Sequence, residues 1–179
     1  ISWLHRRTNK MYQEAASIVA LSEGMQDQIL SHQVPPEKVH VIHNGTDTDQ
    51  FAYAERPFGH RKKRAVYTGT VGKANGLDFL VDIARRLQEQ GRDDIEIKVI
   101  GDGNDLERVR NLADQVGTRN LIFADQVPKE AVRQELLDAD LGLVIFAPYP
   151  VLEANSANKF YDYLATGLPV LLNYQGWQG

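Results

Sequence analysis

The sequence contains no cysteine among its 179 residues, which excludes a disulfide framework, a thiolate metal site and a thiol nucleophile. No apolar run reaches the roughly 20 residues that a membrane-spanning helix needs, and the first residues do not form a signal peptide. Acidic and basic residues nearly balance, with a formal net charge of −4, so no overall positive field attracts nucleic acid. These absences suit a cytoplasmic protein that does not bind nucleic acid.

Several catalytic signatures are also missing. There is no G-x-S-x-G elbow, no P-loop and no complete G-x-G-x-x-G, which argues against a hydrolase triad, a Walker-type NTPase and the usual dinucleotide site. The five histidines show no metal-ligand spacing: His5, His32, His40, His43 and His60. What is present is an ordinary globular composition, 42% hydrophobic and 25% charged, and this argues against a disordered chain.

From residue 65 onward, apolar strands alternate with amphipathic helices. The expected strands are 65–68, 95–100, 121–124, 141–146 and 170–172. The helices between them carry apolar residues at three- and four-residue spacing. Strand, loop and helix units of about 30 residues predict an α/β fold, a Rossmann-like doubly wound parallel sheet with helices on both faces.

The residues before this alternation read as the tail of another unit. A helix that runs into a strand is expected within 9–21, a second helix from Ser22, a strand at 39–42 and a turn at Asn44-Gly45. Residues 52–64, with a basic run from His60 to Arg64, are predicted to form a linker. Because the sequence has no initiator methionine and ends abruptly, we expect it to be a piece of a longer protein.

The most unusual stretch is 153–173. Its helix is expected to stop at Gly167, before Pro169. Polar side chains fill the first turns beside an apolar face: Asn155, Ser156, Asn158, Lys159 and Asp162. Ser156 or Asn155 is expected to cap the helix. The alternative is a solvated surface helix in which Asp162 pairs with Lys159 at i,i+3 spacing.

Ligands of open parallel sheets bind beyond the carboxyl ends of the strands, where loops converge. Four loops are expected there: 69–76, 101–103, 125–127 and 147–159. The first two are rich in glycine, so their backbone N–H groups can approach a phosphate closely, and each precedes a helix N-terminus that favours an anion. The loops and the polar helix together predict a site for a nucleotide or another phosphorylated ligand.

Chemistry suggests a role for each polar side chain. Asp162 is expected to accept hydrogen bonds from a ribose diol, and Lys159 and Lys73 are expected to neutralise a pyrophosphate. Ser156 and the first-turn N–H groups are expected to bind phosphate oxygens. Glu153, just ahead of the helix, is expected to reach a sugar hydroxyl. For Lys73 the alternative is an ordinary solvated lysine.

An ordered set of motifs then becomes recognisable. It comprises S-E-G-M (22–25), V-I-H-N-G-T-D (41–47), Y-T-G-T-V-G-K-A-N-G-L (67–77), V-I-G-D-G (99–103), D-A-D-L-G-L-V-I-F (138–146) and D-Y-L-A-T-G-L-P-V (162–170). This set resembles the family 4 retaining glycosyltransferases of GT-B architecture, over nearly the whole chain. The S-x-N-K-x-x-D-Y-L-A variant (156–165) is similar to a subgroup that builds bacterial surface polysaccharides such as lipopolysaccharide.

The resemblance implies a division into domains and an activity. Residues 1–51 would be the C-terminal tail of the acceptor-binding N-terminal domain, and 65–179 the donor-binding domain. The enzyme would transfer a sugar with retention from a nucleotide-sugar, expected to be a UDP-sugar, to a glycan or polyprenyl-linked acceptor, without a metal or other cofactor. We expect the fragment to bind nucleotide but to transfer little sugar, and the full-length enzyme to contact the inner face of the cytoplasmic membrane peripherally.

The resemblance also places individual residues. Asp162 matches the carboxylate that holds the donor ribose, whereas the family's first glutamate falls at Ala154, one residue after Glu153. Glu153, the carboxylate next to that position, and Lys159, the lysine at the start of the helix, are the candidate catalytic residues.

The arginine and lysine that many members carry in the glycine loop correspond to Thr70 and Asn75, which leaves Lys73 and Lys159 as candidates for phosphate contacts. Gly101, Asp102 and Gly103 are expected near the phosphates, and Gln126 and Val127 near the base. Gly69, Thr70 and Asn158 are further expected contacts to the donor nucleotide.

Two other functions stay open at this stage. One is a non-hydrolysing nucleotide-sugar epimerase, which would need catalytic acids and a histidine that the sequence does not place in the cleft. The other is a non-catalytic Rossmann-like docking module, in which Ser156, Lys159 and Asp162 would only form a solvated face.

Overall fold

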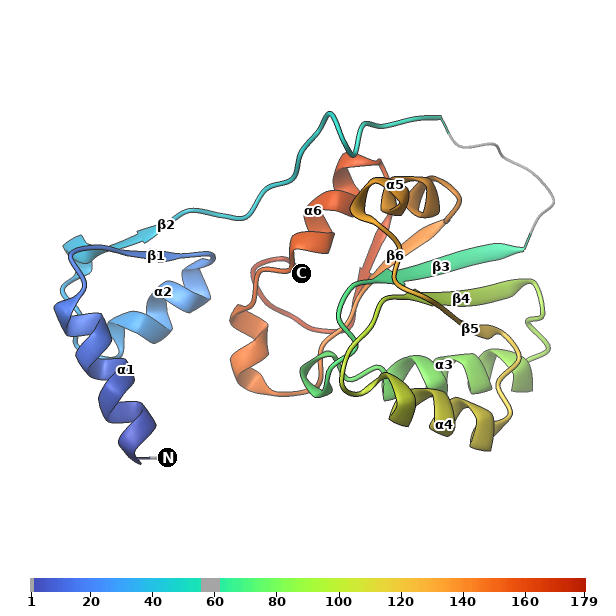
Figure 1. Ribbon diagram of the computed structural model, residues 1–179, viewed down its shortest axis with the longest axis horizontal. Coiled ribbons are helices and arrows are strands. Elements are labelled where there is room, and N and C mark those ends of the chain that lie inside the picture. Colours follow the sequence, from blue (N-terminus) through green and yellow to red (C-terminus); the bar gives the residue numbers. More distant parts are fainter. Residues whose placement is uncertain (1, 56–61) are drawn as a thin grey trace. The chain divides into compact units, whose positions relative to one another are not determined.

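The computed structural model describes residues 2–55 and 62–179, shown as a ribbon in Figure 1. Backbone contacts divide the chain into two compact units. The first comprises Ile1–Asn44, Pro150–Ser156 and Gln175–Gly179, and the second comprises Gly45–Tyr149 and Ala157–Tyr174. This division by contacts differs from the predicted domain boundaries, and the assignment of acceptor and donor domains stays a prediction.

The first unit pairs two short parallel strands beside two helices. Its elements are α1 (Ser2–Glu14), β1 (Ile18–Ala20), α2 (Glu23–Leu30), β2 (Val39–Val41) and the short 3₁₀ helices η1 (Pro36–Lys38) and η3 (Pro150–Ala154). Ser22 caps α2 by accepting a hydrogen bond from the Met25 N–H (3.1 Å), which confirms the predicted helix start. Helix α1 begins before the predicted residue 9, because its first turns contain no breaker and Arg7 stacks on Trp3 one turn away (5.0 Å).

The predicted turn at Asn44-Gly45 is wrong. The side-chain amide of Asn44 donates to the backbone carbonyl of Ser156 (2.9 Å), and Gly45 has no left-handed backbone. The turn forms later, at residues 48–51, where the Asp47 carboxylate accepts the N–H groups of Asp49 and Gln50. The Asn44 side chain, which was expected to stabilise the turn, thus forms a tertiary hydrogen bond instead.

The second unit is a five-stranded parallel sheet of order β5-β4-β3-β6-β7. Its strands are β3 (Lys63–Thr68), β4 (Ile95–Ile100), β5 (Leu121–Ala124), β6 (Leu141–Val144) and β7 (Val170–Leu172). Figure 1 shows α3 (Asp78–Glu89) and α4 (Leu106–Val116) on one face, with α5 (Lys129–Leu137) and α6 (Asn158–Ala165) on the other. The predicted doubly wound α/β fold is confirmed. No helix within residues 2–55 and 62–179 combines the length and apolar character that crossing a bilayer requires.

In the second unit, three strand predictions are right to the residue, and two strand ends differ; in the first unit, the strand predicted at 39–42 ends at Val41. Strand β3 starts at Lys63, inside the predicted linker, of which residues 56–61 lie outside the described chain. Strand β6 ends at Val144, before the predicted Phe146. The reason is that the Phe146 N–H and carbonyl both bond to the Asn173 side chain (2.9 and 2.8 Å) instead of continuing the ladder.

Strand β6 passes closely under α6, and this contact fixes the helix on the sheet. A Cβ at Gly142 would lie 2.4 Å from Cδ2 of Tyr163, whose buried hydroxyl is hydrogen-bonded to Thr68. Replacing Gly142 with alanine should therefore displace α6 and lower the free energy of unfolding in urea by about 1–3 kcal/mol. A Gly45→Ala control, whose added Cβ meets no atom within 4 Å, should change it by less than about 0.5 kcal/mol. Equal stability of the Gly142→Ala variant and the wild type would contradict this packing.

Candidate functional site

The carboxyl ends of the central strands meet at one edge of the sheet. The register pairs Thr68 with Ile100, and Ile100 with Ala124, so the loops that follow β3, β4 and β5 leave the sheet together. The ladder continues beyond the strands, because the Gly69 N–H donates to the Ile100 carbonyl (2.9 Å) and the Val71 N–H to the Asp102 carbonyl (2.9 Å). The two glycine-rich loops are therefore joined into a single backbone surface.

Glycine is required where these loops touch. Gly101 and Gly103 have φ values of +153° and +157°, a region that side chains disfavour. A Cβ on Gly101 would lie 1.9 Å from the Gly69 carbonyl oxygen, and a Cβ on Gly103 would lie 2.3 Å from that of Val71. The glycines of the G-D-G turn thus allow one loop to dock on the other, and the predicted approach of this turn to a phosphate stays a prediction.

Lys159 brings an ammonium on a half-buried side chain to this edge. Its Nζ lies 3.5 Å from the ring centroid of Tyr67 and so close to Gly69 that a Cβ there would sit 3.2 Å away. Within residues 2–55 and 62–179 no carboxylate pairs with Lys159, and burial lowers its pKa from 10.5 to about 7. An anion that binds here would restore the charge that burial disfavours.

The Tyr67 ring is itself held in place beneath Lys159. Its hydroxyl donates to the Thr70 carbonyl (2.7 Å), and burial raises its pKa above the usual value. The face of the ring stabilises the ammonium by a cation–π contact. Sequence reasoning missed Tyr67, because an aromatic residue in a buried strand is usually predicted to be a hydrophobic core residue.

Asp162 does not form the alternative ion pair with Lys159. Its Oδ1 accepts a hydrogen bond from the Thr46 hydroxyl, from the V-I-H-N-G-T-D stretch. Lys159 and Asp162, the two candidate side chains of α6, thus have different partners, and the alternative ion pair between them is absent from the described residues. No local sequence signal connected Thr46 to a residue more than a hundred positions away.

The predicted helix caps are wrong. Helix α6 starts at Asn158 with Ala157 at the cap position, and no side chain caps it. Asn155 accepts the N–H of its neighbour Ser156 (2.9 Å), and the Ser156 hydroxyl, on a side chain only 5% exposed, accepts from Asn44 (3.3 Å). The chain passes through η3 before α6 begins, so these side chains serve the first unit.

The remaining predicted residues fall in three places. Glu153 is exposed and, with Ser156, belongs to the first unit. Lys73 is exposed and lines a cavity of about 730 Å³ whose lining does not include Lys159 or Asp162. The others lie at the carboxyl edge or on α6: Thr70, Asp102, Gln126, Val127 and Asn158.

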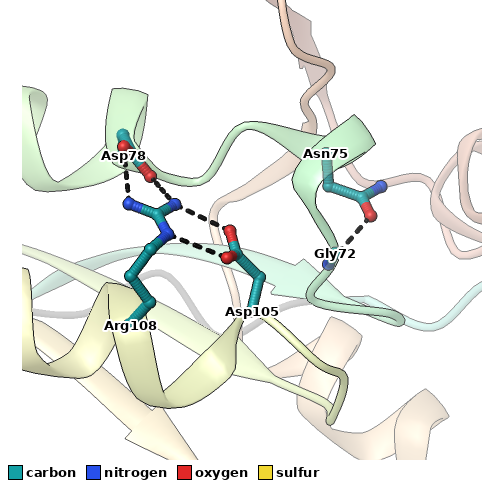
Figure 2. Close-up of polar contacts among 5 residues, drawn as sticks. All are labelled: Gly72, Asn75, Asp78, Asp105 and Arg108. Carbon is teal, nitrogen blue, oxygen red and sulfur yellow. Dashed lines mark hydrogen bonds and ion pairs between the residues drawn. The ribbon is translucent and has the colours of Figure 1, made fainter.

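A polar network that sequence reasoning missed lies beside these loops (Figure 2). The Arg108 guanidinium donates to both oxygens of Asp105 (2.8 and 2.7 Å) and to both oxygens of Asp78 (2.9 and 2.5 Å). Hydrogen bonds from Arg108 hold the pKa of the Asp105 carboxyl below its usual range, against the raising effect of burial, and the charge of Lys73 adds to this. The i,i+3 spacing of Asp105 and Arg108 was visible in the sequence, whereas the partner on α3 was not.

Comparison with known families identifies the class of protein. Residues 62–177 match the family described as "Glycosyl transferases group 1", and residues 1–50 match "Glycosyltransferase Family 4". The first match covers more than half of the chain. The chain therefore belongs to the group 1 glycosyltransferases of GT-B architecture, which confirms the predicted family.

Individual relatives agree with this assignment. The chain is 25% identical to the "Alpha-D-kanosaminyltransferase" of Streptomyces kanamyceticus, over 88% of the chain and 47% of the relative. It is 22% identical to the "Putative colanic acid biosynthesis glycosyl transferase WcaI" of Escherichia coli (strain K12), over 84% of the chain and 39% of the relative. The chain thus spans less than half the length of these curated relatives.

Among solved structures, that of Anabaena Alr3699/HepE in complex with UDP-glucose matches with a TM-score of 0.75. Sequence identity is 15%, and the match covers 96% of this chain and 49% of the other. At this identity the likeness concerns the fold.

Proposed function

We propose that this chain binds the nucleotide-sugar donor of a glycosyltransferase that acts in bacterial glycan biosynthesis. The observation that carries the proposal is the half-buried Lys159, whose ammonium has no carboxylate partner in the described residues and lies beside the glycine-rich loop. The family assignment and the HepE complex with UDP-glucose support a UDP-sugar as donor. The acceptor we propose is a glycan or a polyprenyl-linked sugar, and transfer is with retention.

The residues divide the work of binding and charge stabilisation. Lys159, with the backbone N–H groups at the start of α6, would neutralise the donor pyrophosphate and stabilise charge on the leaving group. Thr46 holds Oδ1 of Asp162, which leaves Oδ2 to accept a hydrogen bond from the ribose diol. The leaving phosphate would take the proton of the acceptor hydroxyl. In this proposal no metal or other cofactor takes part.

The proposal extends to the arrangement of the whole enzyme. The two strands and the helices before residue 51 would belong to the acceptor-binding domain, and the sheet of the second unit to the donor-binding domain. A polyprenyl-linked acceptor would bring the full-length enzyme to the inner face of the cytoplasmic membrane.

Calorimetric titration with UDP, GDP and ADP tests the donor site. We expect selective binding of UDP, and a Kd at least about tenfold weaker in the Asp162→Ala variant, because a carboxylate–hydroxyl hydrogen bond contributes about 1.5–3 kcal/mol. Asp93→Ala, which removes an exposed carboxylate before β4, is the matched control and should bind as the wild type does. Equal affinity of the Asp162→Ala variant and the wild type would place the ribose elsewhere.

The epimerase and docking-module alternatives make different predictions. An epimerase would convert a UDP-sugar without any acceptor, which product analysis with the donor alone would reveal. A docking module would bind none of the three nucleotides and would be insensitive to changes at Lys159 and Asp162.

A further inference from the structure

We propose that Arg108 is a positioning residue that holds the loop Gly69–Gly76 in the conformation that binds the donor phosphates. This inference rests on the proposed function, because it assigns the loop a ligand. Arg108 itself would not touch the donor. It would act through Asp105 and Asp78, the two carboxylates that it joins in Figure 2.

The two carboxylates stand at the exits of the two glycine-rich loops. Asp78 is the first residue of α3, directly after the loop that follows β3, and Asp105 immediately precedes α4, after the loop that follows β4. One guanidinium with four short hydrogen bonds therefore ties both exits together. Its planar fork suits two carboxylates at once, which a lysine ammonium does not.

Asp105 transmits this restraint to the loop through the backbone. Asp105 is only 2% exposed, and its N–H donates to the Val71 carbonyl (3.1 Å). Val71 is fully buried and also donates to Asp102. The next residue, Gly72, donates its N–H to the Asn75 side chain (3.2 Å), so the middle of the loop is held at several points.

The held segment leads directly to the candidate phosphate site. Gly69, two residues before Val71, lies against the Lys159 ammonium, and Thr70 fixes the Tyr67 ring beneath it. Release of Val71 would therefore alter the backbone that faces Lys159. The network does not contain Lys159, so its effect on ligand binding is separable from the charge of the site.

Arg108→Met alone leaves Asp105 as a buried carboxylate without its partner, and the chain should lose stability for that reason. The double variant Asp105→Asn/Arg108→Met removes the uncompensated carboxylate charge. It also removes the clamp, by which we mean the four hydrogen bonds that join Arg108 to Asp105 and Asp78. We expect the double variant to recover most of the urea midpoint lost by Arg108→Met, while its Kd for UDP stays about tenfold weaker than that of the wild type. Arg85→Met, which removes an exposed ion pair with Glu89 on α3, is the control and should leave the Kd unchanged.

Hydrogen exchange provides a readout that does not need a ligand. Without the clamp, the amides of Val71 and Gly72 should exchange at least about tenfold faster in the double variant, because their local opening becomes easier. If the double variant binds UDP as tightly as the wild type, or if its loop amides exchange at the wild-type rate, Arg108 has only a structural role. If the wild type binds no nucleotide, the proposed function fails, and the exchange rates alone then decide whether the clamp exists.

Discussion

The affinity of the chain for UDP is expected to fall about tenfold for each pH unit above about 7. The free Lys159 amine has a pKa of about 7, lowered by burial, whereas a bound pyrophosphate would return it toward its ordinary value of 10.5. Between these two pKa values the complex binds one proton more than the free protein, so binding weakens as protons become scarce. Calorimetry at pH 8 in buffers of different ionisation enthalpy should show uptake of about one proton per UDP.

Two variants separate charge from shape at this position. Lys159→Met should weaken UDP binding by at least about a hundredfold near pH 7, because a charge-assisted contact to phosphate is lost, and should abolish the proton uptake. Lys159→Arg keeps a charge at every pH in the range and should remove the pH dependence. A wild-type affinity that does not vary between pH 7 and 9 would contradict the assignment of Lys159 as the phosphate ligand.

The same burial has the opposite effect on stability. The pKa of Lys159 is lower in the folded chain than in the unfolded chain, so the unfolded chain binds more protons between about pH 7 and 10.5. The contribution of Lys159 to the free energy of unfolding therefore rises with pH across this window. Below pH 7 the destabilisation caused by burying the charged ammonium is fully present. The ligand-free Lys159→Met variant should be more stable than the wild type at pH 6, by on the order of 2 kcal/mol after the cation–π contact is deducted. This advantage should vanish near pH 10, and urea unfolding at the two pH values measures it.

Gly101→Ala is expected to have the largest effect of any single methyl addition at the carboxyl edge. The new Cβ would lie 1.9 Å from the Gly69 carbonyl oxygen, in a backbone conformation with φ of +153°. The new Cβ and the Gly69 carbonyl oxygen cannot move apart without breaking the hydrogen bond from the Gly69 N–H to the Ile100 carbonyl, which extends the sheet. The free energy of unfolding should fall by about 3–5 kcal/mol, and UDP binding should be lost with it.

Gly72→Ala is the matched control for stability. It lies in the same group of loops, has an extended backbone (φ −126°), and its added Cβ would meet no atom closer than 3.5 Å. Its thermal midpoint should stay within a few degrees of that of the wild type, whereas Gly101→Ala should lower the midpoint by about 10 °C. Similar midpoints for the two variants would show that the loops are not docked as described.

Strands were the most predictable elements, because each parallel strand is a short segment rich in apolar residues that its own sequence defines. Strands β4, β5 and β7 match the sequence prediction to the residue. Errors occurred where a distant polar group replaces a local partner. Asn173 ends β6 early by binding Phe146, and Asn44 engages Ser156, which was predicted to cap α6.

The sequence by itself determined the α/β class, the glycine-rich loops at the strand ends and the polar residues Lys159 and Asp162 on one helix, because periodicity and turn chemistry are local properties. Only the tertiary structure decided their partners. It placed Lys159 over Tyr67 without a carboxylate partner in the described chain, gave Asp162 the hydroxyl of Thr46, and joined Arg108 to Asp78 across two loops. Such pairings depend on which strands lie side by side, and the order β5-β4-β3-β6-β7 is a property of the packed sheet that no single segment contains.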